Sequence, residues 1–379
     1  MERLVNLSAY LGRLWAISDV KRCVGLAGST LVVILVALGL FGPIHADHHE
    51  TVSNGGDLGL YTRVIDKVRA GQPYDQVVIK ELRDAGGKVR PFVTIRPPLL
   101  ATALAVLPDP AARILSVRLL AIGVLGAWFL RLGASAQDQR YRWPLLLAMA
   151  SGEIMAFAPQ AYLMHETWAA LLIALSLAWR QRERWLASVA VATVAALVRE
   201  LAAPYLLIML VLALVDRRPK EALGWLAGFV LFAAALARHA AVVDAMFIPS
   251  DPAMPGWLKV GGWPFVLHAM SWNIVALFLP YRVIGGLFPL ALLGLATWRG
   301  ELARRVALTV GGYVVAFLFV GRAGNFYWGL LIAPLWPMGL AMAPAGVSRI
   351  WSWLGLGGAA SANPRTMAEA GGAVPARPQ

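Results

Sequence analysis

Apolar runs near the length needed to cross a bilayer recur along the whole chain. A transmembrane helix needs about 20 apolar residues, and a run above ~18 residues predicts one. Of the 379 residues, 59% are apolar and only 15% are charged, whereas a soluble domain carries about 25% charged residues. The sequence therefore predicts an all-α, polytopic bundle of membrane helices.

About ten segments fit this description, although several are short. We expect spans at residues 24–42, 111–132, 143–160, 166–180, 185–198, 200–215, 221–241, 281–298, 303–320 and 327–344. The apolar stretch 263–280 contains Trp263 and Trp272, which favour a helix at the membrane interface over a further span. The apolar segment 96–108 is too short to span and opens with paired prolines, so we expect a juxtamembrane helix there.

Basic residues predict the orientation, because short cytoplasmic loops are enriched in Lys and Arg. They gather in the N-terminal segment and in alternate loops such as 180–184, 217–220 and 299–305. This pattern predicts a cytoplasmic segment 1–23, a membrane domain 24–344 with external loops 43–110 and 242–280, and a disordered cytoplasmic tail 345–379. The net charge of +13 then reflects membrane topology, not nucleic-acid binding, and the single cysteine excludes an intramolecular disulfide.

The first external loop contains NGGDLGLYTRVIDKVRAG, in which Asp57 follows two glycines and precedes apolar residues at helical spacing. Asp57 is a candidate N-cap, and a cap can also be a reactive carboxylate held at the membrane surface. Asp47 is a second candidate for a catalytic carboxylate. It lies in HADHHE, residues 45–50, which is either a divalent-metal site or, with more weight, a polar linker.

Ionisable residues near the membrane interior cost ~2.5–3.5 kcal/mol on insertion scales and tend to mark functional sites. The pairs His165–Glu166 and Arg199–Glu200 end facing helices. They form either a structural interhelical ion pair or a site in which Arg199 binds an anionic headgroup and the carboxylates orient it. Four further arginines lie near the external surface, where their guanidinium groups either bind phosphate or extend to lipid headgroups: Arg96, Arg113, Arg118 and Arg322. The polar residues thus gather near one face, which favours an enzyme over a transporter.

Together these features resemble the GT-C class of integral-membrane glycosyltransferases, in particular its polyprenyl-phosphate-sugar-dependent, mannosyltransferase-like branch. The resemblance covers about residues 24–340. It is carried by the aspartate of GGDLGLYTRVIDKVRAGQPYD, by the Gly71–Tyr74 stretch, by RPPLLATALAVLP and by spans joined through short basic loops. The chain departs from the family pattern in an extra basic stretch at residues 79–90.

The resemblance implies sugar transfer from a polyprenyl-phosphate donor to a lipid or polysaccharide acceptor, at the periplasmic face of a bacterial inner membrane. Asp57 would be the general base, arginines would stabilise the lipid phosphate, and no cofactor is expected, with metal dependence open. The candidate catalytic residues are Asp57, Asp47 and Glu166, and the candidate substrate-binding residues are Tyr61, Arg96, Arg118, His165, Arg199, Glu200 and Arg322. The alternatives are a transporter or lipid flippase, a noncatalytic envelope-assembly subunit and a multipass acyltransferase.

Overall fold

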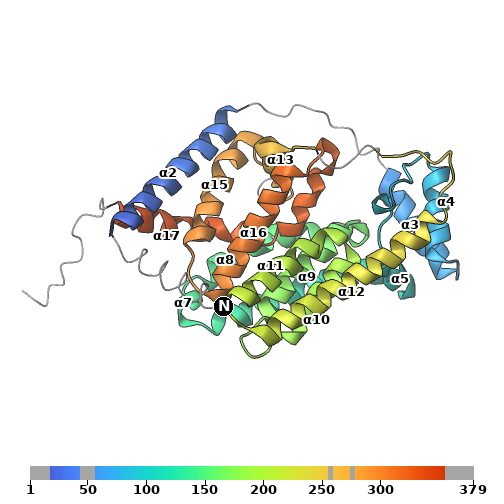
Figure 1. Ribbon diagram of the computed structural model, residues 1–379, viewed down its shortest axis with the longest axis horizontal. Helices are drawn as coiled ribbons and strands as arrows, with labels where there is room; N and C mark the ends of the chain where they lie inside the picture. The colour runs from blue at the N-terminus through green and yellow to red at the C-terminus, as the bar shows by residue number, and fades with distance from the viewer. Residues whose placement is uncertain (1–17, 43–55, 255–258, 274–277, 355–379) are drawn as a thin grey trace, which may run out of the picture.

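The computed structural model describes residues 18–42, 56–254, 259–273 and 278–354. Every named element within these ranges is a helix, which confirms the all-α prediction (Figure 1). Four helices are long and apolar enough to cross a membrane: Cys23–Phe41 within α2 (Ser18–Phe41), α6 (Pro110–Gly133), α12 (Pro219–Asp244) and α16 (Glu301–Phe319). These four match predicted spans, whereas the count of about ten full-length spans is not confirmed.

Five other predicted spans form helices that are shorter than the bilayer core. They are α8 (Arg142–Glu153), α9 (His165–Trp179), α10 (Leu186–Val198), α11 (Ala203–Val215) and α15 (Tyr281–Thr297). The 15 residues of α9 reach about 22 Å at 1.5 Å per residue, against ~30 Å of hydrocarbon. Almost every side chain of α9 is buried, so protein and not lipid surrounds this helix.

The predicted span at residues 327–344 is wrong. The chain instead forms a 3-10 helix, η5 (Ala323–Ile332), then turns, and then forms α17 (Met338–Trp353). Pro334 and Pro337 fall in the turn, and proline lacks the N–H that a continuous helix needs. Helix α17 therefore occupies the first part of the segment that was assigned to the disordered tail, while residues 355–379 lie outside the described residues.

The helices of the predicted first external loop lie together at one end of the molecule (Figure 1). They are α3 (Gly56–Arg69), α4 (Tyr74–Asp84) and α5 (Leu99–Val106), and α5 is the short helix expected after the paired prolines. Several hydrogen bonds tie this group to the segment that follows α12. Among them, Arg83 donates to both carboxylate oxygens of Asp251 at 2.7 Å, and Met254 N donates to Arg90 O at 2.7 Å.

The stretch predicted to lie at the interface forms α13 (Gly262–Ala269), an eight-residue helix that is too short to span. It packs against α16 and η5, and residues 274–277 of that stretch lie outside the description. The remaining short elements are α7 (Ala136–Gln139), η1 (Phe92–Thr94), η2 (Ile154–Phe157), η3 (Ala161–Leu163) and η4 (Glu200–Ala202).

Helices α15 and α17 approach closely because glycines face each other between them. A Cβ atom added to Gly294 would lie 1.9 Å from the carbonyl oxygen of Gly339. Small residues of this kind allow backbone-to-backbone packing between membrane helices, where burial of apolar surface alone gives no drive to associate.

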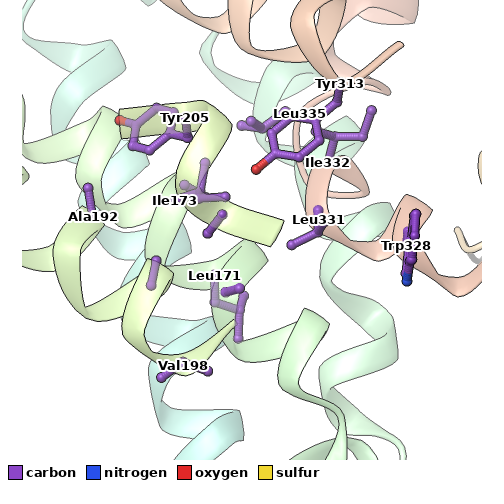
Figure 2. Close-up of a cluster of buried hydrophobic side chains, with 14 of the residues drawn as sticks. Leu171, Ile173, Ala192, Val198, Tyr205, Tyr313, Trp328, Leu331, Ile332 and Leu335 are labelled. Carbon is purple, nitrogen blue, oxygen red and sulfur yellow. The ribbon is translucent and has the colours of Figure 1, made fainter. Parts of the chain in front are cut away.

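The middle of α9 belongs to the apolar core. Figure 2 shows Leu171 and Ile173 of α9 among buried side chains that include Leu331 and Ile332 of η5 and Tyr313 of α16. This contact joins the central helices to the C-terminal helices. The polar residues of α9 are consequently confined to its two ends, and both ends carry a charged cluster.

Candidate functional site

The N-terminal end of α9 contains a buried group of polar residues that we call the Arg199 cluster. Its members are Tyr61, Arg96, His165, Glu166, Arg199, Glu200 and Tyr327. Arg199 Nε donates to Glu166 Oε1 at 2.6 Å, and Arg199 Nη1 donates to Glu200. Arg199 has 0% of its surface exposed. Glu166 lies in the first turn of α9, where the helix dipole favours a negative charge.

Arg96 brings the loop before α5 into the same cluster. Its Nη2 atom donates to the hydroxyl of Tyr327 at 3.1 Å and lies 3.8 Å from Glu166 Oε1. The Tyr74 hydroxyl fixes this loop by donating to the carbonyl oxygen of Arg96 at 2.7 Å. Tyr61 of α3 packs on His165, with ring centroids 5.3 Å apart. The fold thus gathers six of the ten candidate residues from four separate segments.

Several polar atoms of the Arg199 cluster lack a hydrogen-bond partner within the described residues. They are Arg199 Nη2, Glu200 Oε2 and His165 Nε2, and all three are buried. Buried polar atoms in proteins are normally paired. The interhelical ion pair is confirmed, and the same residues keep a donor, an acceptor and an imidazole nitrogen available to a ligand.

The two aspartate candidates remain untested at the level of side chains. Asp57 lies inside the first turn of α3, which begins one residue earlier at Gly56, so the chain there is already helical. The Asp57 side chain lies outside the described atoms, as do Asp47 and the whole HADHHE stretch. Among the residues that are described, no group of three or more His, Cys, Asp or Glu is arranged to hold a metal ion.

The other external arginines have different surroundings. Arg118 donates to the carbonyl oxygen of Phe157 at 2.8 Å, which ties α6 to η2. Arg322 immediately precedes η5, the element that carries Tyr327. Arg113 is buried, not snorkelling: its Nη1 donates to Asp66 at 2.9 Å and so joins α6 to α3.

A pocket of about 350 Å³ lies between α5, the end of α10 and α12, and its lining includes chain neighbours of Arg96 and Arg199 but no member of the cluster. We call it the α5–α12 pocket. Its lining is mostly apolar: Pro97, Pro98, Leu99, Thr102, Ala196, Leu197, Phe232, Ala235, Leu236 and Val242, with Asp75, Arg238 and His239 as its charged or titratable members. Pro97 directly follows Arg96, and Leu197 precedes Arg199 by two residues. Two chain segments, residues 96–97 and 197–199, therefore contribute both to the lining of the apolar pocket and to the Arg199 cluster.

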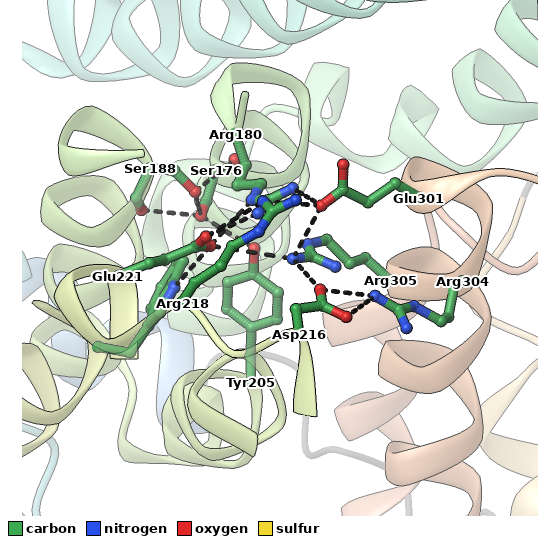
Figure 3. A network of polar contacts seen from close by, with 11 residues as sticks. Ser176, Arg180, Ser188, Tyr205, Asp216, Arg218, Glu221, Glu301, Arg304 and Arg305 are labelled. Carbon is green, nitrogen blue, oxygen red and sulfur yellow. Dashed lines mark hydrogen bonds and ion pairs between the residues drawn. The ribbon is translucent and has the colours of Figure 1, made fainter. Parts of the chain in front are cut away.

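The opposite end of α9 carries a second group that the sequence did not predict, the Arg180 network (Figure 3). Its charged members are Arg180, Asp216, Arg218, Glu221, Glu301, Arg304 and Arg305. Arg180 donates to both oxygens of Glu221, at 2.9 and 2.7 Å, and Arg305 Nη2 donates to Asp216 at 3.2 Å. Arg180 and Arg305 are buried.

One expectation is therefore wrong: the polar residues do not gather near one face only. Two of the basic residues that predict the topology, Arg180 and Arg305, are also buried ion-pair partners. The sequence held a usable signal: Asp216, Glu221 and Glu301 lie in the same short segments as the arginines.

Comparisons with protein-family models, curated proteins and solved structures find no match for this chain. What the chain does must therefore be inferred from its own residues: the Arg199 cluster, the pocket beside it and the Arg180 network at the far end of α9.

Proposed function

We propose that this chain is a membrane glycosyltransferase that moves a sugar from a polyprenyl-phosphate donor to a lipid or polysaccharide acceptor. The observation that carries the proposal is the α5–α12 pocket, an apolar cavity of about 350 Å³ that adjoins a buried cluster of arginines and glutamates. A prenyl-phosphate sugar has the same two parts, an apolar chain and a polar head. Pockets with mostly apolar walls and a few convergent polar groups are typical ligand sites.

The proposed reaction is one direct displacement. The acceptor hydroxyl oxygen forms a bond to the anomeric carbon of the sugar, and the bond from that carbon to the phosphate oxygen breaks. The electron pair of the broken bond leaves with the lipid phosphate. The hydroxyl proton passes to a carboxylate that acts as general base, for which Asp57 is the first candidate and Glu166 the second. The anomeric configuration inverts in such a step, so a product with retained configuration would contradict it.

The geometry around the cluster supports these roles. Tyr61, which packs on His165, follows Asp57 by one helical turn of α3, so the helix that carries the proposed base is anchored at the cluster. Arg96 and Arg199 supply positive charge, and Glu166 and Glu200 hold both guanidinium groups in place. Fixed charges in a water-poor site stabilise developing charge without reorganisation. We place the site at the external face of the membrane, in keeping with the basic-loop pattern, and take the bacterial inner membrane from the resemblance to GT-C enzymes.

A transporter or flippase is the second candidate, and one observation favours it. The Arg180 network and the Arg199 cluster lie at opposite ends of the same helix, α9, as two gates of a transport path would. Vesicles containing the purified chain separate the two functions. A transporter moves prenyl-phosphate sugar between leaflets without any acceptor, whereas a glycosyltransferase consumes the donor only when an acceptor is present.

The decisive experiment is sugar transfer from a panel of polyprenyl-phosphate sugars by purified protein in lipid. Asp57→Asn keeps the size of the side chain but cannot act as a base, and we expect it to lower turnover by roughly 10²-fold or more. Asp84→Asn is the matched control, because Asp84 is an exposed aspartate at the end of α4. Turnover that survives in Asp57→Asn would move the base to another carboxylate. Movement of the prenyl-phosphate sugar between leaflets without sugar transfer would contradict the glycosyltransferase proposal and support the transporter.

A further inference from the structure

A buried carboxyl group lies at the end of α8, outside both charged clusters. Glu153 is 2% exposed, and neither of its carboxyl oxygens has a hydrogen-bond partner among the described residues. The residue interrupts the apolar run of the predicted span at 143–160. Ionisable residues in such runs are costly and mark functional sites by default. Glu153 has no part in the proposed reaction.

Glu153 lines a small cavity between α8, η2, α9 and η5. The cavity has a volume of about 10 Å³, which is close to the least that one water molecule needs. Thr167 of α9 lines the same cavity, and its Oγ1 atom is also buried without a hydrogen-bond partner in the described part of the chain. Both residues with unpaired oxygens therefore lie against one small space. The rest of the lining is apolar: Gly152, Met155, Ala156, Ala170, Leu171, Leu330 and Pro334.

The residues around this cavity favour the neutral form of Glu153, which is the only titratable residue in the lining. Glu166 is next to Thr167 in α9, but it is paired with Arg199 and Arg96 in the Arg199 cluster. An ionised carboxylate that is buried without a cation costs far more free energy than the neutral acid. The neutral acid also carries an O–H donor, which a carboxylate lacks.

The helices packed against α8 supply no ion-pair partner to Glu153 within the described residues. Helix α8 contacts α6, α17 and η2, and η2 contains only apolar residues. The one charged residue of α17, Arg349, lies near Tyr141 at the opposite end of α8. In α6, Arg113 and Arg118 are bonded to other groups. The carboxyl group is therefore left to a ligand that needs little space.

The junction around Glu153 is tightly packed and shares two elements with the Arg199 cluster. A Cβ atom added to Gly152 would lie 1.9 Å from the carbonyl oxygen of Ala333. Helix α9 and η5 both line the cavity, and they carry the cluster members Glu166 and Tyr327. An ionised Glu153 would draw water or a cation into this junction. Its charge state therefore bears on the elements that position the cluster.

We propose that Glu153 and Thr167 form a proton-binding site, in which Glu153 is a neutral carboxylic acid joined to the Thr167 hydroxyl through one water molecule. The ligand is the proton itself: it converts the carboxylate into an acid whose O–H group donates to the water. The bound proton keeps α8, α9 and η5 packed against one another. This site is independent of sugar transfer and would serve a transporter equally well.

The test is the infrared spectrum of purified protein in detergent micelles that contain no ester groups, because the C=O band of a carboxylic acid is separate from the bands of a carboxylate. A free glutamate has a pKa of about 4.3 and is ionised at pH 8. Wild-type protein at pH 8 is expected to show an acid band that Glu153→Gln loses and that Thr167→Val shifts. Glu166→Gln is the matched control, since Glu166 is similarly buried but paired with Arg199, and it should leave the band unchanged.

The pH dependence of unfolding gives a second measurement. Above pH ~4.3 the unfolded chain has an ionised Glu153, whereas the folded site keeps its proton, so folding takes up a proton. The thermal unfolding midpoint of wild-type protein should therefore fall relative to that of Glu153→Gln as the pH rises from 5 to 8. Parallel pH profiles would contradict proton binding.

Three spectroscopic results would overturn the assignment. An absent acid band in wild-type protein at pH 8 would mean that Glu153 is ionised, and this result needs no variant to fold. An acid band that survives in Glu153→Gln would belong to another carboxyl group. A band that disappears when sodium chloride replaces choline chloride would mark a metal-ion site. None of these results depends on sugar transfer, so each leaves the proposed function standing.

Discussion

The two ends of α9 carry the same kinds of charged residue but pair them differently. In the Arg180 network the central carboxylate, Glu221, uses both oxygens: Oε1 accepts from Arg180 and Trp225, and Oε2 accepts from Arg180 and Arg218. Within the part of the chain that the structure describes, the polar atoms without a hydrogen-bond partner there are Nε and Nη1 of Arg305. Such an arrangement is suited to holding helices together.

In the Arg199 cluster a different set of atoms has no hydrogen-bond partner among the described residues, namely a guanidinium nitrogen, a carboxylate oxygen and an imidazole nitrogen. Sugar hydroxyl groups both donate and accept, so this mixed set suits a polyhydroxyl ligand. The chain segments that carry Arg96 and Arg199 also contribute Pro97 and Leu197 to the lining of a pocket of about 350 Å³. The residue types at the ends of a membrane helix therefore do not show whether a charged cluster is structural. The pairing of its polar atoms and the free volume beside it distinguish a structural ion-pair network from a binding site.

Removing a carboxylate from the Arg180 network should cause the largest loss of stability. Glu221→Gln keeps the shape of the side chain but leaves Arg180 and Arg305 buried with too little negative charge. Breaking a buried ion pair by removing one partner costs about 3–5 kcal/mol. The free energy of unfolding in mixed micelles is the measurement, and Glu183→Gln is the control, because Glu183 has an 89% exposed side chain. An unchanged unfolding free energy in Glu221→Gln would mean that the network is not a lock.

The equivalent change in the Arg199 cluster should affect activity more than stability. In Glu166→Gln the guanidinium of Arg199 still contacts Glu200, so part of the charge balance survives. We expect sugar transfer to fall by roughly 10²-fold, since the cluster would lose a fixed charge beside the reacting groups. Turnover and unfolding free energy are measured on the same preparation. A loss of stability as large as that of Glu221→Gln, with normal turnover in the folded fraction, would make the two ends of α9 equivalent.

The sequence predicted the Arg199 cluster better than it predicted the helices around it. His165, Glu166, Arg199 and Glu200 interrupt apolar runs, and a charge in an apolar context is a strong local signal. The bounds of α6 and α12 followed from run length for the same reason. The prediction of a span at 327–344 was wrong because it rested on the length of the apolar run and did not weigh Pro334 and Pro337 within it.

Pairing between distant segments could not be predicted. Loop arginines such as Arg180 predict the membrane orientation through their number. That number contains no information on which carboxylate forms an ion pair with each arginine. Asp75 and His239 lie on α4 and α12, and neither is marked by its local sequence. Only the packing of α4 and the loop before α5 against the end of α12 brings the two together.

A pair of tyrosines offers a finer test of the difference between the two ends. Tyr205 bonds to Ser176 at 2.9 Å in the Arg180 network, and Tyr327 accepts from Arg96 at 3.1 Å in the Arg199 cluster. Loss of one hydroxyl hydrogen bond costs about 0.5–1.5 kcal/mol. Tyr205→Phe should lower the unfolding free energy by this amount and leave turnover unchanged, whereas Tyr327→Phe should lower turnover as well. Equal turnover in both variants would remove Arg96 and Tyr327 from the candidate site.

The ion pair between Arg83 and Asp251 lies outside both clusters and should give the smallest effect, visible only through pH. The hydrogen bond from Arg83 lowers the pKa of Asp251 from 3.8 to about 2. Because the folded-state pKa is the lower one, this pair stabilises the fold above the unfolded pKa, and its contribution is lost as pH falls from about 4 toward 2. Arg83 has a side chain that is 32% exposed, so solvent screens the ion pair and limits its contribution to stability.

The measurement is the thermal unfolding midpoint between pH 5 and pH 3, roughly the range over which the free carboxyl titrates. Wild-type protein should lose slightly more stability over this range than Asp251→Asn, which has no carboxylate to protonate. Identical pH profiles would mean that the contact between α4 and the segment after α12 does not depend on this charge. The remaining hydrogen bonds to that segment, among them Arg83 to Met246 O, Arg90 to Asp251 O and the backbone of Val89 to Pro252 O, would then suffice to hold it.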